Sequence, residues 1–147
     1  MTTTIESVLT KNASHAESVQ PGQPVRFTEA STVGDAFWQG DLCIGITDKI
    51  PADYIRVDSP AAMDAQLVPG NTVGARHCLD SMDGVELYRP RGWGGESLRG
   101  PAFILSQERT IMHPKHGHVT IPAGFIVLTG YQREYDAEQR RERRARD

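Results

Sequence analysis

Short apolar segments separated by turns are the feature of this sequence that most restricts its fold. Between Val25 and Tyr131 they recur about every 8–12 residues, with Gly, Pro and Asp between them. Leu42–Ile46 alternates as a strand does, with apolar side chains at even positions and small ones at odd positions. No window in this region has a convincing helical period, and Ala61–Leu67 could form only a single helical turn. The pattern predicts an all-β fold, either an antiparallel β barrel or a β sandwich.

The turn signals divide this region into a series of expected strands. Met82-Asp83-Gly84 is typical of a hairpin turn and stands directly before one of them. The expected strands are Val25–Thr28, Phe37–Trp38, Leu42–Thr47, Tyr54–Val57, Thr72–Leu79, Val85–Tyr88, Phe103–Leu105, Thr110–Met112, Val119–Ile121 and Phe125–Tyr131. Together they define a predicted β domain over residues 25–135.

The two ends of the chain differ from this domain in composition. Residues 1–24 are polar and close with a Gln-Pro-Gly-Gln-Pro stop, so we expect a flexible, extended N-terminal arm. Residues 136–147 form an Arg-rich segment without an apolar face. Asp136 is a suitable N-cap, and Glu138–Arg141 and Glu142–Arg146 have helical spacing. We therefore expect a short charged C-terminal helix or a solvated tail.

Length and charge restrict the class of protein further. A chain of 147 residues is about the size of one ordinary domain. Residues 1–90 carry 6 Lys and Arg against 12 Asp and Glu, whereas residues 91–147 carry 10 against 7. This distribution favours a basic tail over a nucleic-acid-binding domain.

The cysteines and the N-terminus give an expectation for the cellular compartment. Cys43 and Cys78 have no CxxC spacing and are expected to be free thiols. The first residues lack the basic and apolar regions of an export signal. No apolar run approaches the roughly 18 residues of a membrane span. We expect a cytoplasmic or virion-associated protein without a membrane partner.

Histidines are concentrated just before an expected strand. His113, His116 and His118 fall within six residues, and His77 lies beside Cys78 and Asp80 in another segment. Histidine is the commonest metal ligand, and His116 and His118 at i and i+2 would share one face of a strand. His77, His113, His116 and His118 are therefore candidate ligands of a divalent transition metal. The alternatives are structural or surface histidines, and a catalytic histidine without metal.

A glycine-rich loop with arginines is the candidate binding segment. Arg89, Arg91 and Arg99 surround Trp93, and a guanidinium–indole combination can hold phosphate or stack on a base. The loop lacks the Gly-x-x-x-x-Gly-Lys pattern of a nucleoside-triphosphate cradle. The alternative is a hairpin tip anchored by one tryptophan.

Several short motifs follow one another along the second part of the chain: Gln39-Gly40-Asp41-Leu42, Gly70-Asn71-Thr72-Val73-Gly74-Ala75-Arg76-His77, Leu87-Tyr88, His113-Pro114-Lys115-His116-Gly117, Ile121-Pro122-Ala123-Gly124 and Gln132-Arg133-Glu134-Tyr135-Asp136. In this order and spacing they resemble the motifs of a family of small, largely uncharacterised β-rich proteins from bacteria and their phages. The resemblance covers residues 38–147 and implies one compact β domain in which His77 pairs with His113 and His116. Two positions depart from the family pattern, because Ala75 replaces a histidine and Lys115 stands where relatives often have an acidic residue.

Three hypotheses for the function follow. The leading one is a non-enzymatic accessory or assembly protein that associates with itself, as a homo-oligomer, or with a partner, and that needs no cofactor. The second is a metal- or histidine-dependent enzyme acting on a small or nucleotide-like substrate; no Gly-x-Ser-x-Gly nucleophile elbow is present. The third is a nucleotide or nucleic-acid binder that uses the arginine and tryptophan loop.

Overall fold

The described residues form two larger β-sheets and a separate two-stranded hairpin, with almost no helix. The structure is a computed structural model that describes residues 17–18, 25–69, 77–94, 97–136 and 141–144. The seven-stranded sheet has the order β1 (Glu17–Ser18), β3 (Ala36–Gln39), β4 (Leu42–Thr47), β11 (Ile126–Tyr131), β8 (Arg99–Leu105), β7 (Val85–Pro90) and β5 (Tyr54–Arg56). The four-stranded sheet has the order β2 (Val25–Arg26), β10 (Val119–Ile121), β9 (Arg109–Met112) and β6 (Cys78–Leu79). A 3-10 turn, η1 (Ala62–Ala65), is the helical element of the described residues.

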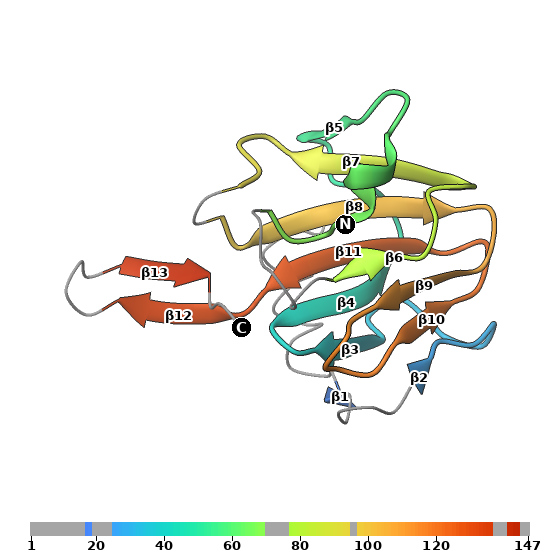
Figure 1. The fold of residues 1–147 in the computed structure, drawn as a ribbon, viewed down its shortest axis with the longest axis horizontal. Coiled ribbons are helices and arrows are strands. Elements are labelled where there is room, and N and C mark those ends of the chain that lie inside the picture. The colour runs from blue at the N-terminus through green and yellow to red at the C-terminus, as the bar shows by residue number, and fades with distance from the viewer. Residues whose placement is uncertain (1–16, 19–24, 70–76, 95–96, 137–140, 145–147) are drawn as a thin grey trace.

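The two sheets stack on each other through one hydrophobic core. Figure 1 shows the smaller sheet in front of the strands β3, β4 and β11. Phe27 follows β2 and meets Phe37 of β3 edge to face, with ring centroids 4.8 Å apart. Burial of each large apolar side chain stabilises the fold by about 1.5–3 kcal/mol. The core includes Phe27, Leu42, Ile44, Ile46, Leu79, Leu87, Phe103, Leu105, Ile111, Val119, Ile121 and Val127.

The larger sheet also buries part of its outer face. All six residues of β4 are buried, so Leu42, Ile44 and Ile46 face the core while their neighbours are covered on the other side. A second cluster of Tyr54, Ala102 and Leu128 lies outside this core. This two-sided burial explains why β4 and β11 contain few charged residues, as central strands do.

The architecture confirms an all-β fold and selects the sandwich-like alternative, because the two sheets do not close into a barrel. The sheets are mixed rather than purely antiparallel. β1 pairs in parallel with β3, and β2 pairs in parallel with β10. Neither pair is joined by a hairpin turn, so no tight turn imposes the antiparallel direction.

The expected strands are found with shifted ends. β4 and β10 have the predicted bounds, whereas β8 begins at Arg99, four residues earlier than expected. Cys78–Leu79 is the described part of the expected strand Thr72–Leu79, and residues 70–76 lie outside the described residues. Of the predicted arm, Glu17–Ser18 forms β1 in the larger sheet, and the rest of residues 1–24 is not among the described residues.

The C-terminal helix, one of the two expectations for residues 136–147, is not found among the described residues. β12 (Arg133–Asp136) and β13 (Arg141–Arg144) form an antiparallel hairpin, which extends beyond the two sheets in Figure 1. A helix this short is marginal in water, because nucleation is unfavourable and no apolar face packs it. In the register of this hairpin, Glu134 is paired with Arg143 and Asp136 with Arg141 along the backbone.

No helix in the described part of the chain has the length and apolar character needed to cross a membrane.

Candidate functional site

The two histidine segments meet in the interior between the sheets. His77 precedes β6, and His113 follows β9, the strand that pairs with β6. The ring centroids of His77 and His113 are 4.4 Å apart, and those of His113 and His116 are also 4.4 Å apart. The rings of His77 and His116 lie 6.5 Å apart at an interplanar angle of 14°. The structure therefore brings together the three histidines that the sequence assigned to one site, with His113 in the middle.

His77 is held at both ring nitrogens by side chains of the larger sheet. Its Nδ1 lies 2.8 Å from Oε1 of Gln39, and its Nε2 lies 3.0 Å from Oδ1 of Asp41. The exposed fractions are 1% for His77, 0% for Gln39 and 5% for Asp41. Gln39 ends β3 and Asp41 precedes β4, so the two-residue turn between these strands delivers both partners. Gly40 has a φ of 59°, which a turn of this length favours and glycine adopts without strain.

The amide of Gln39 fixes the protonation of the His77 ring. Nε2 of Gln39 donates to the carbonyl oxygens of Ile111 and Gly117, both at 2.9 Å. Its Oε1 is therefore the acceptor that faces His77, and Nδ1 of His77 carries a proton. Nε2 of His77 and Oδ1 of Asp41, 3.0 Å apart, complete a buried hydrogen-bonded pair between the two sheets.

His113 is used to shape the turn that follows it. Its Nδ1 accepts hydrogen bonds from the backbone N–H groups of Lys115 and His116 at 3.0 and 3.1 Å. The proton of the neutral ring is therefore on Nε2, which is buried without a hydrogen-bond partner among the described residues. Burial, followed by the neighbouring rings of His77 and His116, lowers the pKa of His113 from 6.5 to about 4. The ring is neutral at physiological pH.

The nitrogens of these rings do not converge on a common point. His118 is exposed, and its Nδ1 accepts a hydrogen bond from the backbone N–H of His113. Among the residues that the structure describes, no group of three or more His, Cys, Asp or Glu side chains is arranged to hold a metal ion. The rings of His77, His113 and His116 form a packed cluster, and His118 is joined to it through the backbone N–H of His113.

The two thiols lie in different environments. Cys43 is buried in β4, and burial raises the pKa of its thiol to about 12. Cys78 is half-buried on β6, and neither cysteine forms a disulfide. The raised pKa of Cys43 makes its thiolate scarce at neutral pH.

The arginines of the predicted binding loop are engaged within the protein. Arg89 donates to Oδ1 of Asp64 at 3.0 Å, and its guanidinium lies 4.2 Å from the centre of the Trp93 ring. Trp93 in turn donates from Nε1 to the Tyr131 hydroxyl at 2.9 Å. This part of the loop is a fixed arrangement in which the charge of Arg89 is balanced.

Arg99 is separated from this group and has its own partners. It binds both carboxylate oxygens of Asp53 at 2.6 and 2.8 Å, and its guanidinium lies 4.9 Å from the ring centre of Tyr54. The hydrogen bonds from Arg99 hold the pKa of Asp53 below its usual value. Arg91 is exposed. The predicted binding residues therefore divide into Arg89 with Trp93, a paired Arg99, and a solvent-facing Arg91.

The fold and this cluster define a class, a two-sheet all-β domain whose sheets are joined by buried histidine, glutamine and aspartate side chains. The chain belongs to the family described as Domain of unknown function (DUF8820), which matches residues 38–129. The match begins one residue before Gln39 and includes every described histidine and the Arg89–Trp93 pair. The curated proteins and the solved structures compared with the chain contain no match.

Gln39 and Asp41 were not predicted as site residues. In the sequence they stand in the Gln-Gly-Asp motif at the start of a strand, but their contacts with His77 span 38 and 36 residues. A polar residue on each side of a turn glycine, directly before a fully apolar strand, is the one local signal that could have marked them. The identity of their partner depends on how the two sheets stack.

Proposed function

We propose that this protein is a non-enzymatic accessory or assembly protein of bacterial or phage origin, whose β domain mediates association with itself or with a partner protein. The observation that carries the proposal is the complete engagement of His77, the most deeply buried of the described histidines. Both of its ring nitrogens are occupied by Gln39 and Asp41. The residue types that suggested chemistry in the sequence serve to join the sheets, and the protein acts through its surface in the cytoplasm or on a virion.

The enzymatic alternative has less support in the geometry. A general base must reach a substrate proton through an accessible nitrogen or a bridging water. Nδ1 of His113 is occupied by two backbone N–H groups, and Nε2 of the same ring is buried. The low pKa of His113 also leaves it a weak proton acceptor at neutral pH.

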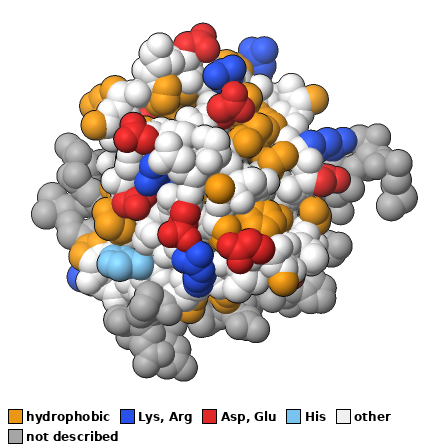
Figure 2. All heavy atoms as spheres, turned by 90° about the vertical axis from the view of Figure 1, so that its right-hand side faces the viewer, with side chains coloured by type: hydrophobic (Ala, Val, Ile, Leu, Met, Phe, Trp, Pro, Cys, Tyr) orange, Lys and Arg blue, Asp and Glu red, His pale blue; other side chains and the backbone are white. Residues whose placement is uncertain are grey.

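Binding of nucleic acid is disfavoured by the charge distribution of the described surface. A nucleic-acid footprint needs basic side chains gathered on one face. Figure 2 shows acidic and basic side chains interspersed among hydrophobic ones on the face that it presents. Carboxylates lie beside five of the described arginines: Arg26, Arg56, Arg89, Arg99 and Arg109.

Sedimentation velocity over a concentration series, combined with elemental analysis, tests the proposed function. We expect species heavier than the 16.2 kDa chain, and zinc, iron and manganese well below one atom per chain. A metal present at one atom per chain and lost on His116→Ala would overturn the proposal in favour of the enzyme. A strictly monomeric protein would overturn self-association, and the proposal would then depend on a different partner protein.

A further inference from the structure

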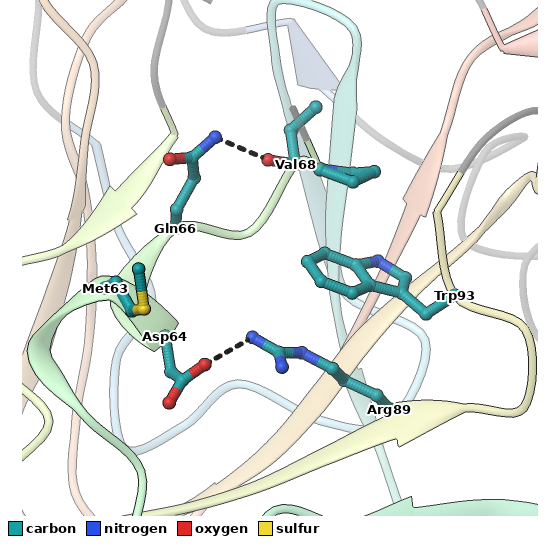
Figure 3. Close-up of a pocket in the computed structure, with 7 residues that line it drawn as sticks. Met63, Asp64, Gln66, Val68, Arg89 and Trp93 are labelled. Atoms are coloured by element: carbon teal, nitrogen blue, oxygen red, sulfur yellow. Dashed lines mark hydrogen bonds and ion pairs between the residues drawn. The ribbon is translucent and has the colours of Figure 1, made fainter. Parts of the chain in front are cut away.

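An open cleft lies where the η1 turn faces the end of β7. Its volume is about 310 Å³, at the lower end of the roughly 300–1,000 Å³ of ligand pockets. Figure 3 shows Met63 and Gln66 on one side and Trp93 on the other, with the Arg89–Asp64 ion pair bridging the two sides. The lining residues are Met63, Asp64, Gln66, Val68, Pro69, Arg89 and Trp93.

Trp93 is fixed in place on one wall of this cleft. Its Nε1 donates to the Tyr131 hydroxyl at 2.9 Å, and that hydroxyl donates to the carbonyl of Leu67 at 2.7 Å. Because the polar edge of the indole is satisfied inside the protein, its apolar end points toward Met63 and Gln66 (Figure 3). The guanidinium of Arg89 supports the ring from one face at 4.2 Å. An occupant would meet an aromatic surface that needs little ordering on binding.

The polar groups of the cleft are balanced in charge. Arg89 donates to Oδ1 of Asp64, and Oδ2 of Asp64 accepts from the backbone N–H of Ala61 at 2.7 Å. Because these two charges neutralise each other, the cleft offers neither an acidic nor a basic occupant an unpaired counter-charge. Gln66 contributes an uncharged amide, whose Nε2 donates to the carbonyl of Val68 at 2.7 Å. The cleft therefore favours a neutral occupant.

Met63 places a highly exposed apolar side chain at the cleft. Its exposed fraction is 80%, the highest of the large exposed hydrophobic residues described. Trp, Arg and Met are the residue types enriched at protein–protein interfaces, and aromatic residues and arginine are frequent hot spots there. All three residue types line this one cleft of about 310 Å³, as Trp93, Arg89 and Met63.

We propose that the cleft between Met63 and Trp93 receives a tyrosine side chain carried by a protein partner. A phenol ring is neutral, fits beside the thioether and the indole, and its hydroxyl can pair with the cleft's carboxylate, guanidinium or amide. The proposal rests on the proposed function in that the occupant belongs to a partner protein. It adds the chemistry of the contact and the residues that make it.

The test uses the fluorescence of Trp93 in the full chain. Trp38→Phe leaves Trp93 as the single tryptophan, since the sequence contains two. N-acetyl-tyrosinamide is the probe, titrated with excitation selective for tryptophan. We expect a saturable change with a dissociation constant on the order of 1 mM, the range of a small fragment. N-acetyl-glycinamide, which lacks the ring, should give no saturable change.

Two exposed methionines provide a matched pair of variants. Met63→Lys in the Trp38→Phe background should weaken probe binding at least about tenfold, because it introduces a charge and removes an apolar wall. Met112→Lys changes an exposed methionine on β9 outside the cleft and should leave binding unchanged. Both positions are exposed, so circular dichroism should report intact folds for both variants.

Other results overturn the inference. Absence of saturable binding, equal binding after Met63→Lys, or equal binding of N-acetyl-glycinamide would each contradict it. Saturable binding of guanosine but not of N-acetyl-tyrosinamide would assign the cleft to a nucleobase. The titration does not depend on self-association. A monomeric protein that binds the probe would contradict self-association alone. An oligomer that does not bind the probe would contradict the cleft assignment alone.

Discussion

Gln39 of the larger sheet and His77, the residue before strand β6 of the smaller sheet, share a hydrogen bond of 2.8 Å in the interior of the domain. The same glutamine amide donates to the carbonyl oxygens of Ile111 and Gly117. One side chain therefore satisfies three buried backbone or ring groups that belong to the smaller sheet and its β9–β10 connection.

The first prediction concerns Gln39. Gln39→Leu leaves Nδ1 of His77 and the carbonyls of Ile111 and Gly117 buried without their partner. Each unsatisfied group costs about 1–3 kcal/mol, so we expect the free energy of unfolding to fall by at least about 3 kcal/mol. Urea denaturation followed by circular dichroism measures it. Gln107→Leu, at an exposed position, should change stability by less than about 1 kcal/mol, and a similar loss in both variants would contradict the buried role.

The second prediction concerns the Asp41–His77 pair. Asp41→Asn should destabilise the protein by about 1–3 kcal/mol, because it replaces the carboxylate that is hydrogen-bonded to the buried imidazole. His77→Gln in the Asp41→Asn background should cost less than His77→Gln alone, with a coupling of about 1 kcal/mol or more. Asp53→Asn removes a more exposed carboxylate from Arg99 and should cost less than about 1 kcal/mol. Additive effects of Asp41→Asn and His77→Gln would contradict the pairing.

The third prediction concerns the pH dependence of stability. The folded state holds the pKa of His113 at about 4, whereas the ordinary value is 6.5. Between these values the unfolded chain binds a proton that the folded state does not bind, so the contribution of His113 is complete above about pH 6.5. It is lost progressively as the pH falls toward about 4. Urea midpoints measured from pH 7 to pH 4 should fall more steeply in the wild type than in His113→Gln.

The carboxylates titrate in both the wild type and His113→Gln. The difference between the two slopes of urea midpoint against pH therefore reports on His113. His118→Gln, at an exposed position of the same connection, should keep the wild-type slope. Identical slopes in the wild type and His113→Gln would show that His113 does not titrate differently in the two states.

The fourth prediction concerns the two thiols. The pKa of Cys43 is raised to about 12 by burial, so its reactive thiolate is scarce at neutral pH. A disulfide reagent should react with no more than one thiol per folded chain, that of the half-buried Cys78, and with two after unfolding. Cys43→Ala should leave the reaction of the folded protein unchanged. Two rapidly reacting thiols in the folded state would contradict the burial of Cys43.

Local patterns predicted the strands better than they predicted the way the strands assemble. Leu42–Thr47 could be recognised because its alternation is a property of adjacent residues. Closure into a barrel or separation into two sheets depends on pairings such as β4 with β11, whose partner residues are 79 to 89 positions apart in sequence. In the C-terminal segment the local pattern itself was misleading. Its charges have helical spacing, but residues 141–144 pair with strand β12.

The site shows the same division. The proximity of His77 to His113 followed from a family resemblance and from the expected strands. The partners of His77 could not be derived, since Gln39 reaches it only when one sheet is stacked on the other. Arg89 and Arg99 were expected to face a ligand, but Asp64 and Asp53, 25 and 46 residues away, neutralise them.

The two carbonyls bound by Gln39 stand on either side of the histidine connection, at Ile111 before it and Gly117 near its end. Two hydrogen bonds from Gln39 therefore hold the segment from Ile111 to Gly117 against the β3–β4 turn. In amide hydrogen exchange, the backbone groups of this segment and of that turn should open together as one cooperative unit. The domain would then come apart by the separation of its sheets rather than by fraying of the histidine loop.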